Sequence, residues 1–205
     1  MCVYSIEMKQ IHTFGDSHSS FGWRHIQNVN INHLGPVLCH TIGKYDQNRL
    51  NIKNYGVKNN DTVIFSFGEI DCRCHIYKHV TNKLSYREII DSIVTNYFRT
   101  INKNVEVFTN LRVCVYNIVP PIEKSLKTEN PSFPYLGTDE ERKSYVLYFN
   151  EKLKEQCLLN DFIFFDIYDK YTDDRGFLKN ELSDGNVHID NPIYIKEFLE
   201  TRLKL

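Results

Sequence analysis

Alanine is absent from this 205-residue chain, and tryptophan occurs only once, at Trp23. The lack of alanine goes with an abundance of Asn, Lys, Ile, Tyr and Phe, a bias expected of an AT-rich genome, and it carries no information about chemistry. An excess of either charge is also lacking, since 25 Lys and Arg stand against 26 Asp and Glu and the net charge is -1. A protein that binds nucleic acid through its phosphates needs a basic surface. The composition therefore argues against nucleic acid as a partner.

Long hydrophobic runs are missing as well. No apolar stretch approaches the roughly 18 residues of a membrane span, so no membrane partner is expected. Residues 1–10 mix Glu7 and Lys9 with apolar residues and lack the apolar core of a signal peptide, which predicts a cytoplasmic protein. In such a chain, scattered cysteines are best interpreted as free thiols. They are Cys2, Cys39, Cys72, Cys74, Cys114 and Cys157.

Short apolar runs alternate with stretches of helical periodicity. Four of the runs are continuous, which is typical of strands buried on both faces of a parallel sheet: 11–14, 63–67, 113–119 and 162–165. A fifth segment, 27–33, alternates polar and apolar residues and predicts an edge strand. The length suits one domain over residues 1–205. We expect an α/β fold, a three-layer α/β/α sandwich around a mostly parallel five-stranded sheet.

The predicted helices have clear start signals. Ser85 with Glu88, and Thr138 with Glu141, form capping boxes before apolar stripes of 3,4 spacing. Asn191 and Pro192 supply an N-cap and a first-turn proline for a last helix. Segment 123–137 lacks periodicity, and a loop of that length in a compact domain is usually functional or mobile. We expect it to cover a site.

Candidate catalytic residues lie near both ends of the chain. In parallel sheets, ligands bind beyond the carboxyl ends of the strands, and the first predicted strand ends in Gly15-Asp16-Ser17. A serine hydroxyl is a weak nucleophile that needs a base. Asp184 and His188 lie on one loop, close enough for the carboxylate to orient the imidazole. Ser17, His188 and Asp184 thus form a candidate triad, with Asp190 as the alternative acid.

These blocks resemble the SGNH (GDSL-type) hydrolase superfamily over nearly the whole chain. The turn with Ser17 is similar to the block that carries the nucleophile, and the Asp184–His188 loop is similar to the last block. Gly35 is similar to the glycine whose N–H lines the oxyanion hole. The resemblance implies a hydrolase without a cofactor, with Ser17 as nucleophile and the N–H groups of Ser17 and Gly35 as oxyanion donors.

The sequence departs from the family pattern at two positions. The third block of the family reads Gly-x-Asn-Asp, and its Asn donates to the oxyanion, whereas this chain has Ile70 there. Losing one such donor typically costs about a hundred- to thousandfold in rate, and Arg73 or His75, a few residues further on, is the candidate replacement. The last block of the family reads Asp-x-x-His, whereas three residues separate Asp184 from His188 here.

Residues 68–75 are also similar to a Gly-Glu-[Ile/Val]-Asp-Cys subgroup that accompanies glycan-synthesis enzymes. This resemblance implies a carbohydrate ester, above all an acetyl ester, as substrate, with Glu69, Arg73 and His75 as candidate substrate-binding residues. Paired acids next to an arginine more often form an ion-pair network, so a structural role for Glu69 and Asp71 is an open alternative. Cysteines 72 and 74 with His75 lack the spacing of a complete zinc site, so no metal is expected.

Several functions remain open at this point. An acyl-enzyme on Ser17 can pass its acyl group to water, as in an esterase, or to a sugar hydroxyl, as in an O-acyltransferase. Alternatively, Ile70 marks a glycan-binding protein that has lost catalysis, although a pure binder has no need of a retained triad. Gly-Asp-x-His at 15–18 also opens the metallophosphoesterases, but their further metal-binding blocks are absent. We expect His18 to line the wall of the site.

Overall fold

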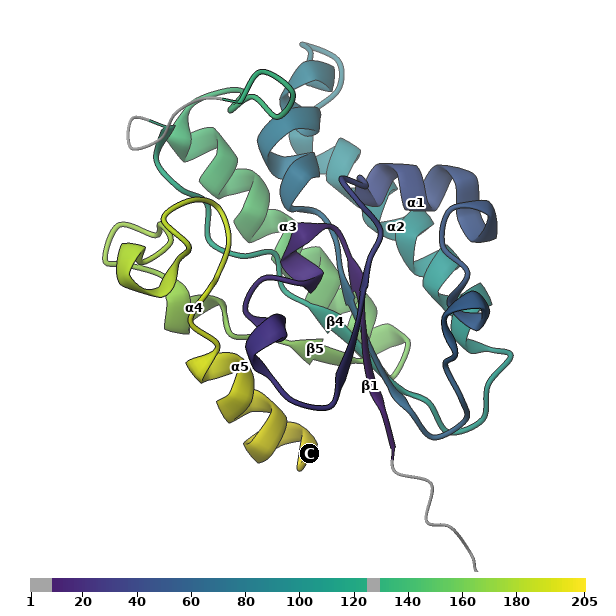
Figure 1. The fold of residues 1–205 in the computed structure, drawn as a ribbon. Coiled ribbons are helices and arrows are strands. Elements are labelled where there is room, and N and C mark those ends of the chain that lie inside the picture. Colours follow the sequence, from purple (N-terminus) through teal and green to yellow (C-terminus); the bar gives the residue numbers. More distant parts are fainter. Residues whose placement is uncertain (1–8, 125–129) are drawn as a thin grey trace, which may run out of the picture.

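A single parallel sheet forms the centre of the protein. The structure, a computed structural model, describes residues 9–124 and 130–205 (Figure 1). Five strands lie in the order β2-β1-β3-β4-β5, and every neighbouring pair is parallel. The strands are β1 (Ile11–Gly15), β2 (Val29–His33), β3 (Thr62–Ser66), β4 (Arg112–Tyr116) and β5 (Ile163–Phe165). The predicted α/β fold is confirmed, and β2 is an edge strand as expected.

Helices cover both faces of the sheet and complete the three layers (Figure 1). The helices are α1 (Cys39–Tyr45), α2 (Tyr86–Val105), α3 (Asp139–Leu159), α4 (Tyr168–Tyr171) and α5 (Ile193–Phe198). Apolar residues of α1, α2 and α3 pack with Phe14 and Phe65 in one core cluster. Residues of α4 and α5 pack with Trp23, Ile64 and Phe165 on the other face. Ile64 and Phe65, which are adjacent in β3, thus pack into the core clusters on opposite faces of the sheet. This explains why the apolar runs are continuous.

The capping signals are largely confirmed. Both predicted capping boxes are formed at the starts of α2 and α3. Helix α5 begins one residue later than predicted, and the Asn191 Oδ1 atom accepts the N–H of Ile193 at 3.1 Å. Strand β4 ends earlier than the apolar run 113–119 suggested. Beyond Tyr116, the N–H of Ile118 binds the Oδ1 atom of Asn150, at 2.7 Å, instead of a neighbouring strand.

The register of the sheet brings the predicted site segments together. Gly15, the last residue of β1, pairs with His33 of β2 and with Ser66 of β3. The segments that follow these strands therefore start at one edge of the sheet. A Cβ atom on Gly15 would overlap the carbonyl oxygen of Ser66, so only glycine fits at this strand end.

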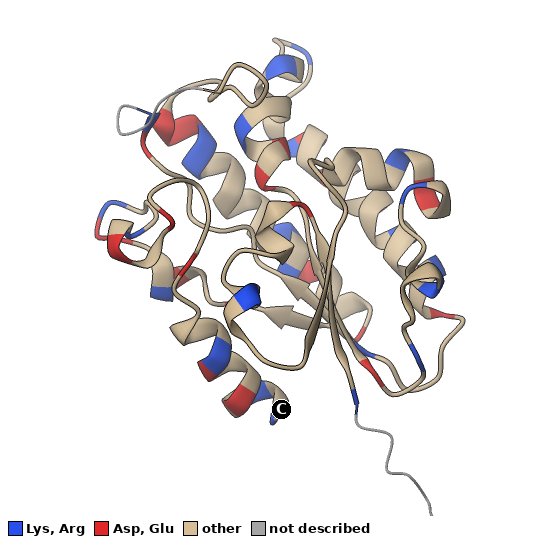
Figure 2. Ribbon diagram, in the orientation of Figure 1, with Lys and Arg blue, Asp and Glu red and all other residues tan. Residues whose placement is uncertain are grey.

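The surface and the thiols agree with the composition. Lys and Arg residues are interspersed with Asp and Glu residues over the helices and loops (Figure 2). Five of the cysteines are buried free thiols, as predicted, and Cys2 lies outside the described residues. Within the described ranges, none of the helices combines the length and the apolar character that a membrane crossing requires.

Candidate active site

Ser17 opens a tight turn directly after β1. A short 3-10 helix covers Ser17–Ser19, and the carboxylate of Asp16 caps it by accepting the N–H of His18 at 2.9 Å. The hydroxyl of Ser19 donates to the carbonyl oxygen of Asp16 at 2.8 Å. Asp16 and Ser19 are both fully buried, so the backbone around Ser17 is held from the inside. Asp16 is a structural acceptor in this turn, as its place in the motif suggests.

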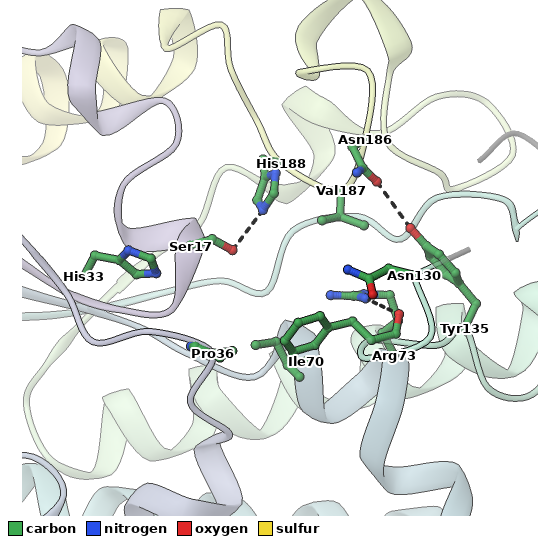
Figure 3. Close-up of a pocket in the computed structure, with 11 residues that line it drawn as sticks. Ser17, His33, Pro36, Ile70, Arg73, Asn130, Tyr135, Asn186, Val187 and His188 are labelled. Carbon is green, nitrogen blue, oxygen red and sulfur yellow. Dashed lines mark hydrogen bonds between the residues drawn. The ribbon is translucent and has the colours of Figure 1, made fainter. Parts of the chain in front are cut away.

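His188 reaches Ser17 from the far end of the chain. Its Nε2 atom lies 2.8 Å from the Ser17 Oγ atom (Figure 3), and its Nδ1 atom lies 2.7 Å from Asp184 Oδ2. A carboxylate can only accept, so the proton of a neutral imidazole lies on Nδ1 and the Nε2 lone pair faces the serine hydroxyl. The three side chains predicted as a triad therefore lie in one hydrogen-bonded chain.

The loop that carries Asp184 and His188 absorbs the extra residue of the last block. The N–H of Asp184 donates to the carbonyl oxygen of His188 at 3.0 Å, which closes the loop on itself. Asp184 Oδ1 accepts the N–H groups of Asn186 at 2.8 Å and of His188 at 3.2 Å. Gly185 has a φ of +79°, a conformation that glycine adopts without strain. The longer spacing thus forms a compact turn that aims Asp184 at His188.

Asp190, the alternative acid, lies elsewhere. Its Oδ1 atom accepts a hydrogen bond from Arg24 at 2.6 Å and lies 3.3 Å from the Nε2 atom of His25. The structure therefore places Asp184, and not Asp190, on the imidazole of His188.

Packing and charge both act on His188. The ring of Phe21 stacks on it with centroids 3.9 Å apart and an interplanar angle of 10°. Burial, followed by the nearby His18, lowers the pKa of His188, while Asp184 and Glu69 act in the opposite direction. A lowered pKa keeps this imidazole neutral near pH 7, which is the form a general base needs.

A pocket of about 310 Å³ opens in front of Ser17 and His188 (Figure 3). Its wall combines aromatic, aliphatic and amide side chains with one guanidinium. The lining residues are Ser17, His33, Pro36, Ile70, Arg73, Asn130, Phe133, Tyr135, Asn186, Val187 and His188. Pockets of this size and mixed lining are typical of small-molecule sites.

One wall of the pocket is formed by segments that follow β2 and β3. Gly35 has a φ of +79° and lies between the pocket-lining segments at His33 and Pro36. Ile70 lines the pocket with an apolar side chain that is 6% exposed. The position that supplies an amide donor in the resembled family therefore presents only hydrocarbon here.

Arg73 lies in the pocket wall as half of a buried ion pair. Its Nε and Nη2 atoms donate to the carboxylate of Glu69 at 2.6 and 2.9 Å, and Nη1 donates to the carbonyl oxygen of Phe133 at 2.9 Å. The guanidinium also lies 5.3 Å from the ring centroid of Tyr135. Arg73 lowers the pKa of Glu69 despite its burial. The guanidinium of Arg73 donates these three hydrogen bonds and still has further N–H groups that can bind a ligand.

Glu69, Asp71 and His75 do not line this pocket, and Glu69 reaches it only through its ion pair with Arg73. Asp71 is fully buried and accepts the N–H groups of Cys39 and His40, at 2.6 and 3.0 Å, at the start of α1. It therefore anchors a helix, and the ion-pair reading holds for Glu69 alone. The His75 ring lies 4.8 Å from His40 and 4.5 Å from His79, and its pKa is lowered to about 4, chiefly by burial. Over residues 9–124 and 130–205, no group of three metal-ligating side chains is placed to hold an ion.

Sequence reasoning missed several pocket residues. Asn186 and Val187 lie beside His188, and the Tyr135 hydroxyl donates to Asn186 Oδ1 at 3.4 Å (Figure 3). Asn130 and Phe133 also line the pocket, so the described part of segment 123–137 reaches the site as expected, while 125–129 lie outside the described residues. For Asn130, Phe133 and Tyr135 the only signal in the sequence was the unusual length of that loop. Phe21 gave no signal at all.

Comparisons with known proteins give matches only at the level of structure. No family model matches the sequence, and a search of curated proteins finds no match either. A GDSL-like lipase from Bacteroides thetaiotaomicron superposes with a TM-score of 0.59 at 12% identity, over 96% of this chain and 86% of that chain. An aryl esterase from M. smegmatis gives 0.55 at 14% identity, over 95% and 99%. An acetyl xylan esterase gives 0.57 at 14% identity, over 94% and 99%.

These matches extend over nearly the whole chain at low identity, so they bear on the fold. The chain has the α/β/α fold found in GDSL-like esterases and lipases, with its serine, histidine and aspartate joined at the carboxyl edge of the sheet.

Proposed function

We propose that this protein is a serine esterase or O-acyltransferase of the SGNH (GDSL-type) superfamily. The observation that carries the proposal is the continuous hydrogen-bonded chain from Asp184 through His188 to Ser17, at 2.7 and 2.8 Å, at the mouth of a pocket. A nucleophile, a base and an orienting acid in this geometry are the parts that acyl transfer needs.

The mechanism follows from the atoms that face one another. His188 Nε2 takes the proton of the Ser17 hydroxyl as Oγ attacks the ester carbonyl carbon, while Asp184 holds the Nδ1 proton and stabilises the imidazolium. The proton then passes from Nε2 to the leaving alcohol oxygen, and the carbon–oxygen bond of the ester breaks. Water or a second alcohol, deprotonated by His188, attacks the acyl-enzyme and restores Ser17.

The negative charge that develops on the carbonyl oxygen needs donors. The N–H groups of Ser17 and Gly35 are the proposed pair, because both lie on turns that follow the paired ends of β1 and β2. Ile70 adds none, so a free N–H of Arg73 is the proposed third donor or a contact to the substrate. Each oxyanion donor is typically worth a hundred- to thousandfold in rate, about 3–4 kcal/mol.

We propose an acetylated carbohydrate as the substrate. The pocket offers aromatic faces on Phe133 and Tyr135, which suit the apolar faces of a sugar ring, and amide groups on Asn130 and Asn186, which suit its hydroxyls. One structural neighbour is named an acetyl xylan esterase. Hydrolysis and transfer use the same residues and differ only in the acceptor. His75 and Glu69 do not line the pocket, so Arg73 is the proposed polar contact to the substrate, and Glu69 holds its guanidinium in place.

The second candidate function is glycan binding without catalysis, which Ile70 favours. The two functions separate in a turnover assay with p-nitrophenyl acetate and acetylated xylo-oligosaccharides, with free sugar added as competing acceptor. Catalysis predicts acetate release that Ser17→Ala abolishes and that the matched control Ser20→Ala retains. Transfer predicts acetylated acceptor in the same reaction. A folded wild-type protein that binds the oligosaccharide but hydrolyses or transfers none of its esters would refute the enzymatic function and support glycan binding.

A further inference from the structure

The residue after the candidate nucleophile is a buried histidine that is bonded at both ring nitrogens. His18 is 6% exposed, its Nδ1 atom lies 2.9 Å from Asp16 Oδ1, and its Nε2 atom lies 3.2 Å from the carbonyl oxygen of Val187. A carboxylate and a carbonyl oxygen can only accept hydrogen bonds. A neutral imidazole carries one N–H, so only the doubly protonated imidazolium satisfies both partners.

The surroundings of His18 supply the compensating charge. Asp16 is fully buried, and among the described residues its Oδ2 atom has no hydrogen-bond partner, while its Oδ1 atom lies 2.9 Å from the His18 ring. Burial lowers the pKa of His18, but Asp16, Glu69 and the Val187 carbonyl outweigh it and the net shift is upward. The opposing like charge would be that of a protonated His188, whose ring centroid lies 4.9 Å away. Together, these neighbours favour the protonated, charged form of the His18 ring.

The two partners of His18 adjoin the two reacting side chains. Asp16 directly precedes Ser17 in the turn after β1, and Val187 directly precedes His188 in the C-terminal loop. These segments are 169 residues apart in sequence at the His18–Val187 bond. We propose that His18 is a positioning residue, a buried imidazolium that holds the turn of the nucleophile against the loop of the base. Its catalytic consequence rests on the proposed esterase function.

A fixed charge at His18 also acts on His188. A like charge nearby disfavours protonation of His188, while Asp184 and Glu69 favour it. The two ring centroids lie 4.9 Å apart, and in a buried site the repulsion between two such charges is only weakly screened, so it lowers the pKa of His188. His18 therefore keeps His188 available as a base at lower pH.

The charge state of His18 is testable without any activity. In protein labelled with 15N-histidine, the ring shifts report which nitrogens carry protons, and Ser17→Ala removes turnover from the measurement. We expect both nitrogens of His18 to be protonated at pH 7. His12, a buried histidine whose pKa is lowered chiefly by burial, is the neutral reference. A single protonated nitrogen on His18 at pH 7 would overturn the proposal.

The positioning role is testable through the pH profile. In His18→Gln the amide can still donate to the Val187 carbonyl but carries no charge, and His18→Leu lacks both. We expect the acid limb of kcat/KM to move to higher pH in both variants. We expect kcat to fall about ten- to a hundredfold in His18→Leu, less in His18→Gln, with KM little changed. The exposed His25→Gln should match wild type.

The outcomes separate this proposal from the proposed function. Absence of wild-type activity at every pH would refute the esterase function and leave the 15N shifts to decide the charge of His18. Active, folded variants whose acid limb and kcat equal those of wild type would refute the positioning role alone. If the variants fail to fold, the 15N shifts of the wild-type ring and the titration of His188 still test the charge.

Discussion

Replacing Asp184 by Asn is expected to trap His188 in the wrong tautomer. Asp184 Oδ1 accepts two backbone N–H groups, those of Asn186 and His188, so the amide oxygen of Asn would take this place. The amide NH2 would then replace Oδ2 and face His188 Nδ1 at 2.7 Å. A donor at that position forces Nδ1 to accept, so the imidazole proton moves to Nε2 and points at Ser17. A protonated Nε2 cannot take the serine proton.

The size of the effect follows from the loss of the base. A wrong tautomer in a Ser-His-Asp triad lowers kcat by about 10⁴-fold, or about 5.4 kcal/mol of transition-state stabilisation. Asp184→Ala removes the carboxylate without adding a donor, so His188 can keep its proton on Nδ1 in a fraction of molecules. We therefore expect Asp184→Ala to retain more activity than Asp184→Asn, although Asn resembles Asp more closely in size and shape.

The assay is kcat for p-nitrophenyl acetate at several pH values, with thermal unfolding to show that the variants fold. Asp190→Asn is the matched control, because its carboxylate binds Arg24 and His25 and not His188. It should keep wild-type kcat. Comparable kcat in Asp184→Asn and wild type, or a greater loss in Asp190→Asn, would refute the assignment of the acid.

Three further predictions concern the walls and the support of the site. Phe21→Ala removes the ring stacked on His188 and should lower kcat about three- to tenfold with KM nearly constant, measured by steady-state kinetics. Ile70→Asn introduces an amide donor into the pocket that Ser17 lines and should raise kcat by up to about a hundredfold. An unchanged or lower kcat would argue against an oxyanion hole there. Asp71→Asn leaves one N–H of α1 facing an NH2 group and should cost about 1–3 kcal/mol of unfolding free energy at pH 5. Burial raises the pKa of Asp71 from 3.8 to about 7, so the folded state binds the extra proton and wild-type stability falls as pH rises between these values. Asn does not titrate, so the difference in unfolding free energy between wild type and Asp71→Asn should be smaller at pH 8 than at pH 5. Urea unfolding at the two pH values measures it.

The fold and the meeting of Ser17, His188 and Asp184 could be predicted from the sequence because each rests on local signals. Continuous apolar runs predict buried parallel strands, and the capping boxes at Ser85 and Thr138 fix where α2 and α3 begin. Parallel strands also share a carboxyl edge, so a serine after the first strand and an acid–histidine pair after the last converge there.

The remaining features depend on contacts that no local pattern encodes. The stacking of Phe21 on His188 and the His18–Val187 bond join segments more than 160 residues apart. Sequence alone also left Asp190 open as the acid, and its salt bridge with Arg24 is a tertiary contact. His75 lies four residues after Asp71, where the third block ends, but the π-helical turn at Asp71–His75 places it against His40 and His79 instead of in the pocket.

The central claim is that Ser17 is an activated nucleophile, and labelling with a fluorophosphonate probe tests it most directly. The reagent traps a serine only where a base has made it reactive, and mass spectrometry of the digest locates the adduct. We expect one adduct, on Ser17, that disappears in Ser17→Ala and persists in Ser20→Ala. A folded wild-type protein that stays unlabelled, or that is labelled at another serine, would contradict it.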